Sequence, residues 1–254
     1  MEPSTPQKSS TAVPIAIVTG FAMIAIAIFF TGSKEASAPQ EAVQAVNNPA
    51  AVQTEPIRPV TGDDYILGNP NAPILMIEYS DYDCPFCKQF HSTMHQVLDE
   101  YGVSGRLAWV YRQFPLVDLH PNAPVLSEAA LCVGDIGGND AFWTFSDAVF
   151  DSRFETEFTN ITKLGEFATA AGVEPGEVQE CLDSDRMLDR LKADMADGLN
   201  AGAQGTPYTV IKVGSQEAVI NGAQPYDVVK GIVETLVEQL DGTFDPNGID
   251  VSNQ

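Results

Sequence analysis

Two cysteines separated by two residues, Cys84 and Cys87, stand where an apolar run gives way to a helical pattern. The run Ile74–Tyr79 is typical of a short buried strand, and Pro85–Tyr101 carries apolar residues at helical spacing before Gly102. A strand that leads into a helix at such a pair indicates an α/β domain with both sulfur atoms in the first turn of the helix.

The rest of the central region continues this alternation. Strands are predicted at Leu107–Gln113, Tyr208–Val213 and Glu217–Ile220, and a helix at Pro225–Leu240. Between Asn122 and Ala203 the patterns are only helical, with breaks at 137–139, near 160 and at 172–176. We therefore predict an α/β fold with an all-helical block inserted at about residues 118–203.

The position of the cysteines indicates disulfide exchange, in which a thiolate is the nucleophile. The N-terminus of a helix stabilises a thiolate through its unpaired N–H groups and its dipole, and Pro85 fits the first turn. On a helical projection Phe86, Phe90 and later apolar residues fall on one face that includes Cys87 but not Cys84. We therefore predict an accessible, attacking Cys84 and a buried, resolving Cys87.

A zinc site is the metal alternative, because His91 and His95 follow Cys84 and Cys87 on the same helix. Cys84 and His95 are 11 positions apart, which is about 16 Å along a straight helix. Zinc ligands lie about 2.0–2.3 Å from the metal, so one helix cannot supply all four. We predict no metal and no other cofactor, with His91 and His95 on the solvent side of the helix.

The chain resembles the DsbA-like thiol-disulfide oxidoreductases, which are thioredoxin-fold proteins of bacterial cell envelopes. The segments that carry this resemblance are Ile77–Cys87, Arg112–Leu116, Leu119–Pro121, Gly205–Pro207 and Gly222–Tyr226, in the order and spacing of the family. The resemblance covers about residues 64–240 and implies a thioredoxin-like fold. It also implies that Pro207 is a cis-proline opposite Cys84 and Cys87, and that Thr206 and Pro207 line the groove for a substrate strand.

The resemblance implies an enzyme that introduces disulfides into reduced secreted or envelope proteins, with a membrane-bound redox partner. Phe86 replaces the histidine of the strongly oxidising Cys-Pro-His-Cys members, which puts the oxidising strength in question. A disulfide reductase or isomerase of the same fold is one alternative. A redox-inactive module that binds peptides beside Pro207 is another, although the intact cysteine pair argues against it.

Glu78 interrupts the apolar strand six residues before Cys84. It could be a strand-edge carboxylate that faces water. If it is buried instead, desolvation raises its pKa and lets it relay the proton of Cys87. The resemblance also places an acid at this position, so we expect a proton relay.

The other two cysteines, Cys132 and Cys181, lie in the helical block. Four cysteines allow three pairings, and the Cys84–Cys87 pair leaves only Cys132–Cys181. This bridge would close a loop of about 50 residues and contribute about 4 kcal/mol in the chain-entropy treatment. Two free, buried thiols are the alternative.

A charge-free apolar stretch at residues 12–30 is long enough to span a bilayer core of roughly 30 Å. A cleaved signal peptide is the alternative, because Ala36-Ser37-Ala38 resembles a cleavage site, although Pro39 would hinder cleavage. We therefore divide the chain into a short tail (1–11), a transmembrane anchor or signal peptide (12–30), a flexible linker (31–60), the folded domain (61–240) and a disordered tail (241–254).

The net charge of −22 argues against a nucleic-acid partner, which needs a positive surface, and against polybasic attachment to anionic lipid. We expect a single-pass membrane protein whose catalytic domain lies outside the cytoplasm, in the periplasm or at the cell exterior. The cysteine chemistry points to the same side of the membrane, because disulfides persist in oxidising compartments.

Overall fold

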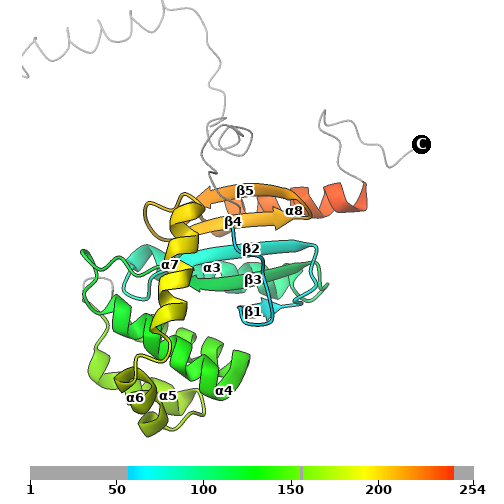
Figure 1. Cartoon of the computed structure of the whole chain (residues 1–254). Helices are drawn as coiled ribbons and strands as arrows, with labels where there is room; N and C mark the ends of the chain where they lie inside the picture. The colour runs from blue at the N-terminus through cyan, green and yellow to red at the C-terminus, as the bar shows by residue number, and fades with distance from the viewer. Residues whose placement is uncertain (1–56, 155–156, 243–254) are drawn as a thin grey trace, which may run out of the picture. The chain divides into compact units, whose positions relative to one another are not determined.

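The computed structural model describes residues 57–154 and 157–242. Within them, one sheet of five strands has the order β1-β3-β2-β4-β5 (Figure 1). The strands are β1 (Tyr65–Gly68), β2 (Ile74–Ser80), β3 (Leu107–Gln113), β4 (Tyr208–Val213) and β5 (Gln216–Asn221). The helices are α3 (Pro85–Tyr101), α4 (Ala123–Ser152), α5 (Leu164–Ala170), α6 (Pro175–Asp183), α7 (Leu188–Asn200) and α8 (Tyr226–Asp241), with a short 3-10 turn at Ile161–Lys163. This confirms the predicted α/β fold with an inserted helical block.

The central strand β2 pairs in parallel with β3 and antiparallel with β4. Helix α3 makes the connection between β2 and β3, as a parallel pair requires. Because side chains alternate along a strand, Met76 enters the core that α3, α4 and α8 share, while Ile77 and Tyr79 enter a second core on the other face. Helix α7 covers that second face (Figure 1). Burial on both faces explains why β2 reads as an almost continuous apolar run.

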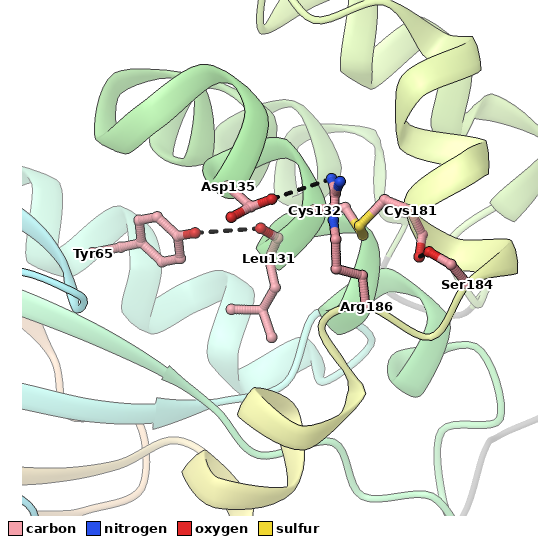
Figure 2. Close-up of a disulfide and its surroundings, with 7 residues drawn as sticks. All are labelled: Tyr65, Leu131, Cys132, Asp135, Cys181, Ser184 and Arg186. Carbon is pink, nitrogen blue, oxygen red and sulfur yellow. Dashed lines mark hydrogen bonds and ion pairs between the residues drawn. A yellow bond between two sulfur atoms is a disulfide. The ribbon is translucent and has the colours of Figure 1, made fainter.

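The helical block packs on the β1 side of the sheet and folds back on itself. Helix α4 is divided at Gly138, whose φ of 82° and ψ of −172° interrupt the helical backbone at the predicted break. A disulfide joins Cys132 of α4 to Cys181 of α6, with a Cα–Cα distance of 5.9 Å (Figure 2). The bridge therefore ties the returning helices to the long helix from which they depart.

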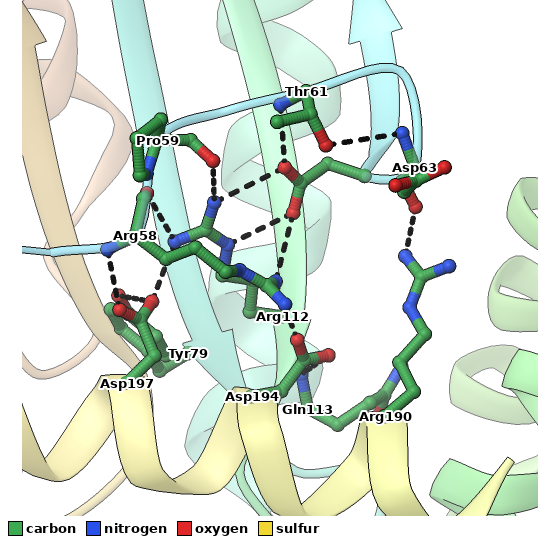
Figure 3. A network of polar contacts seen from close by, with 11 residues as sticks. Arg58, Pro59, Thr61, Asp63, Tyr79, Arg112, Gln113, Arg190, Asp194 and Asp197 are labelled. Atoms are coloured by element: carbon green, nitrogen blue, oxygen red, sulfur yellow. Dashed lines mark hydrogen bonds and ion pairs between the residues drawn. The ribbon is translucent and has the colours of Figure 1, made fainter.

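A buried ionic network fixes α7 to the sheet (Figure 3). Arg112 of β3 is fully buried and donates hydrogen bonds to both carboxylate oxygens of Asp64 and to Oδ2 of Asp197. Arg58 pairs with Asp64 and with Asp194 of α7 at 2.7 Å. Because removing one partner would leave a buried charge uncompensated, we expect such a network to hold its elements in one arrangement.

The structure differs from prediction at one strand and at one domain boundary. Strand β1 was not predicted, because it has only four residues and its pairing with β3 decides its conformation. The end of the predicted linker is also wrong, since Ile57 is 4% exposed and packs with Ile77 and Tyr79. A single apolar residue in a Pro- and Gln-rich stretch has no periodicity from which burial could be predicted.

The predicted anchor at 12–30, most of the linker at 31–60 and the tail from 243 onward lie outside the described residues. Within residues 57–154 and 157–242, none of the helices combines the length and the apolar character needed to cross a membrane.

Candidate functional site

Cys84 stands at the boundary between the loop after β2 and the first turn of α3. Its φ of −78° and ψ of 122° are extended, and Pro85 begins the helix. Asp81 holds the loop: its side chain accepts hydrogen bonds from the backbone N–H of Asp83 and Leu116 and lies 2.8 Å from Nδ1 of His120. Sequence reasoning assigned no role to Asp81, because its partners Leu116 and His120 lie 35 and 39 residues further along the chain.

The two thiols are separate in this structure, and the fold covers both. Cys87 is fully buried, as predicted, whereas Cys84 is only 2% exposed, so its predicted accessibility is wrong. The covering segment comes from far along the chain, since Sγ of Cys84 lies 3.4 Å from the carbonyl oxygen of Thr206. A helical projection considers only one helix and cannot anticipate that contact.

The peptide bond between Thr206 and Pro207 is cis. Its segment leads directly into β4, the strand that pairs with β2. The structure thus brings Thr206 to Cys84, as the resemblance implied. The substrate-binding role of Thr206 and Pro207 stays a prediction.

The two sulfur atoms differ in acidity. The pKa of Cys84 is lowered to about 6 by a hydrogen bond from the Cys87 thiol and further by Thr206 and the backbone N–H groups of Phe86 and Cys87, although burial opposes the shift. Burial raises the pKa of Cys87 well above its ordinary value, and the hydrogen bond to Cys84 adds to this. The geometry therefore favours a thiolate on Cys84 and a protonated thiol on Cys87.

Glu78 lies on β2, is fully buried, and accepts a hydrogen bond of 2.9 Å from Nε1 of Trp109 on β3. Desolvation raises the pKa of Glu78 to about 7, and its charge is one of the factors that raise the pKa of Cys87. The water-facing alternative is therefore excluded. The side chain has the acidity that a proton relay at neutral pH needs, while the relay itself stays a prediction.

The exposure of the two histidines on α3, His91 and His95, also differs from prediction. His91 is 5% exposed rather than solvent-facing, because α4 packs over this face of α3. Nε2 of His91 and Nε2 of His95 both lie within 3.0 Å of Oδ1 of Asp147 on α4. Nothing in the sequence connects Asp147 with the two histidines, which lie 56 and 52 residues before it.

An apolar surface adjoins Cys84. Phe86 was predicted on the buried face of α3, but it lies in the first turn and is 58% exposed. The segment that follows α4 reaches the same loop, because Arg153 donates to the carbonyl of Asp83 and the N–H of Thr159 donates to the Asp83 carboxylate. This segment carries Phe154 and Phe158, which are 71% and 51% exposed. The three exposed aromatic side chains therefore lie on segments that adjoin the Asp83–Cys84 loop.

Comparison with known proteins agrees with this geometry. A sequence model of the thioredoxin family matches residues 60–235. The chain belongs to the thioredoxin family. Its fold is DsbA-like: the crystal structure of α-DsbA1 from Wolbachia pipientis matches with a TM-score of 0.62 and 22% sequence identity, over 73% of this chain and 96% of that one.

Two relatives of this thioredoxin-family chain have curated descriptions. A protein of Rickettsia typhi, described as a "Putative protein-disulfide oxidoreductase", is 26% identical over 180 residues, which are 68% of this chain and 60% of that protein. A protein of Mycolicibacterium vanbaalenii, described as "Na(+)/H(+) antiporter NhaA 1", is 30% identical over 165 residues, which are 63% of this chain. The chain spans only about a quarter of the length of that antiporter (25%), so we transfer no transport activity from it.

Proposed function

We propose that this chain is a thiol-disulfide oxidoreductase that forms disulfides in reduced secreted or envelope proteins outside the cytoplasm. One observation carries the proposal. Cys84, whose thiol has a pKa lowered to about 6, immediately precedes α3 and lies beside Thr206, while Cys87 lies buried in the first turn with a raised pKa. A sulfur with a low pKa is a good leaving group, and a leaving group of this kind favours the transfer of a disulfide to the client.

The reaction starts from the Cys84–Cys87 disulfide. A client thiolate attacks Sγ of Cys84, the bond between the two sulfurs breaks, and Cys87 leaves with the electron pair and takes a proton. Glu78 supplies that proton, since its pKa of about 7 keeps much of it protonated at neutral pH. A second client thiolate then attacks the client sulfur of the mixed disulfide and releases Cys84 as a thiolate. The client is oxidised, and the pair gains two electrons.

The exposed phenylalanines beside Cys84 give this proposal a binding surface for clients. The exposed side chains of Phe86, Phe154 and Phe158 offer apolar contacts that many sequences can make. Such a surface suits clients that are still unfolded and expose their own apolar residues. We further propose that the segment from Thr206 and Pro207 pairs with an extended client strand.

Location outside the cytoplasm has two supports. The Cys132–Cys181 disulfide is of a kind that persists in oxidising compartments. The apolar stretch at 12–30 is long enough to anchor the chain in the membrane, and the sequence predicts a flexible linker after it. A membrane-bound partner would then remove the two electrons and restore the Cys84–Cys87 disulfide.

The deciding experiment is equilibration of the full chain with glutathione, combined with oxidation of a reduced test protein. We expect a reduction potential well above the glutathione poise and formation of disulfides in the test protein. A potential near that of thioredoxin, about −270 mV, would instead assign the chain to the reductases. The side chain of Phe86, which offers Cys84 neither a charge nor a hydrogen-bond donor, favours a weaker oxidant than the histidine-containing members. If oxidised chain does not exchange with any thiol, the module that only binds peptides is the better description.

A further inference from the structure

The histidine–aspartate cluster between α3 and α4 takes no part in the proposed exchange reaction. His91 and His95 lie one helical turn apart on α3, and Asp147 faces them from α4. Oδ1 of Asp147 lies 2.7 Å from Nε2 of His91 and 3.0 Å from Nε2 of His95, and the two nitrogens are 3.1 Å apart. Three atoms that can each donate a lone pair therefore converge on one point.

Hydrogen bonding alone leaves this triangle incompletely explained. A neutral imidazole carries N–H at only one of its nitrogens, and the carboxylate oxygen offers only lone pairs. If both histidines donate to Asp147, two N–H groups face each other at 3.1 Å. If one histidine does not donate, the lone pair of its Nε2 atom faces the negatively charged carboxylate of Asp147. A cation at the centre satisfies all three atoms at once.

The spacing also fits a transition metal. Zn²⁺ binds imidazole nitrogen at about 2.0–2.1 Å and carboxylate oxygen at about 2.0–2.2 Å, which places tetrahedral ligand atoms about 3.3 Å apart. The observed separations of 2.7–3.1 Å are reached from that geometry by side-chain shifts of a few tenths of an ångström. Two histidines at i and i+4 on one helix are a known way to hold zinc.

The surroundings favour a dication with an open coordination position. The side chains of His95 and Asp147 are 34% and 44% exposed, so an ion and a water molecule can reach the cluster from solvent. Asp99 and Asp151 lie close enough to add negative potential at His95. The ammonium group of Lys88 donates its hydrogen bonds to the backbone carbonyls of Asp151 and Arg153 and not to the carboxylate of Asp147.

We propose that His91, His95 and Asp147 form a binding site for a divalent first-row transition metal ion of the zinc type, with water as the fourth ligand. Imidazole and carboxylate ligands suit Zn²⁺ and its neighbours better than Ca²⁺ or Mg²⁺. Nδ1 of His91 is buried without a hydrogen-bond partner among the described residues. In metal sites the second ring nitrogen of a histidine ligand usually donates a hydrogen bond that orients the ring, and loss of that bond weakens metal binding by about 10–100-fold. We therefore expect a site of moderate affinity from which a chelator removes the metal.

The chain carries a built-in reporter for this site. Its sequence contains two tryptophans. The Trp109 ring lies 5.1 Å from that of His91 and 5.5 Å from that of His95, and Trp143 lies 6.5 Å from His91. Bound Cu²⁺ or Co²⁺ should therefore quench most of the tryptophan emission, while Zn²⁺ should bind without strong quenching and compete with either ion.

The experiment titrates the purified full chain with Zn²⁺ by calorimetry and with Co²⁺ by tryptophan emission. The Cys84–Cys87 pair is kept oxidised, so that its thiols cannot act as ligands. The test variants are His95→Ala and Asp147→Asn, since both side chains are partly exposed and both substitutions should fold. The matched controls are Asp99→Asn and Asp151→Asn, which remove one nearby negative charge without removing a ligand.

We expect one ion per chain, at least tenfold weaker binding in both test variants, and less than threefold change in both controls. Thermal unfolding without metal checks that every variant folds, and Zn²⁺ should raise the melting temperature of the controls but not of the test variants. The proposal is wrong if the parent chain binds no Zn²⁺, or if test variants and controls lose affinity equally. The latter result would mean diffuse binding to the acidic surface. Because the oxidised chain is used, the result is independent of any exchange activity.

Discussion

Sγ of Cys84 lies 3.4 Å from the carbonyl oxygen of Thr206, although 122 residues separate the two in the chain. This contact brings the segment before β4 against the first turn of α3. It covers the sulfur that the helix alone would expose, and the side chain of Thr206 helps to lower the pKa of that sulfur.

The first prediction assigns the two sulfurs. Cys84→Ser should abolish disulfide exchange, whereas Cys87→Ser should accumulate a mixed disulfide between the client and Cys84. The reason is that only Cys84 combines a lowered pKa with a position beside Thr206. Alkylation of the reduced chain, followed by peptide mass spectrometry, should label Cys84 first at pH 7. Faster labelling of Cys87 would reverse the assignment.

The second prediction concerns Glu78 and catalysis. Glu78→Gln can still accept the hydrogen bond from Trp109 but cannot supply a proton to Cys87. We expect client oxidation at pH 7 to slow by about 100-fold, the lower range for a positioned general acid. Stopped-flow measurement of client attack on the oxidised pair should show a rate that falls above pH 7 in the parent chain and less so in the variant. An unchanged rate would remove Glu78 from the mechanism.

Glu78 should also make stability depend on pH. Its pKa in the folded chain is about 7 against an ordinary value of 4.5, so its protonation stabilises the fold below pH 4.5 and this contribution is lost as the pH rises through 7. The difference is about 3 kcal/mol. In denaturant unfolding of the oxidised chain, Glu78→Gln should therefore be more stable than the parent at pH 8, with little difference at pH 4.5. If the free energies of unfolding of the two chains changed in parallel with pH, the pKa of Glu78 would not be raised.

The third prediction concerns the redox state. In the reduced chain the pKa of Cys84 is about 6 against an ordinary value of 9, so its thiolate stabilises the fold above pH 9, and this contribution is lost as the pH falls through 6. The oxidised chain has no such group. The melting temperature of the reduced chain, measured relative to the oxidised one, should therefore rise between pH 5 and pH 8. A difference that does not change with pH would mean that the Cys84 pKa is not lowered.

The fourth prediction concerns the disulfide in the helical block. Cys132 and Cys181 are 49 residues apart, and the chain-entropy treatment gives about 4 kcal/mol for a loop of this length. Replacing both with alanine should lower the free energy of unfolding by about that amount and leave the Cys84–Cys87 potential unchanged. Non-reducing peptide mapping should find the bridge, and mild reduction that opens Cys84–Cys87 should leave it closed. Two free thiols in protein from an oxidising compartment would contradict this account.

Local patterns were enough to predict much of the domain. The apolar run of β2, the helical spacing of α3 and the Cys84–Cys87 pair between them are neighbours in the chain, so their sequence indicates both the elements and the chemistry. The burial of Cys87 and the break at Gly138 also follow from local periodicity and from a residue that tolerates positive φ.

Long-range packing decided the rest. β1 is a strand because β3 offers it a partner, and Cys84 is covered because the Thr206 segment returns to it. Asp147 meets His91 and His95 only because α4 packs against α3. Sequence periodicity reports which face of an element is apolar, but not which distant segment will cover it. Those contacts depend on how the sheet and the helical block pack in three dimensions.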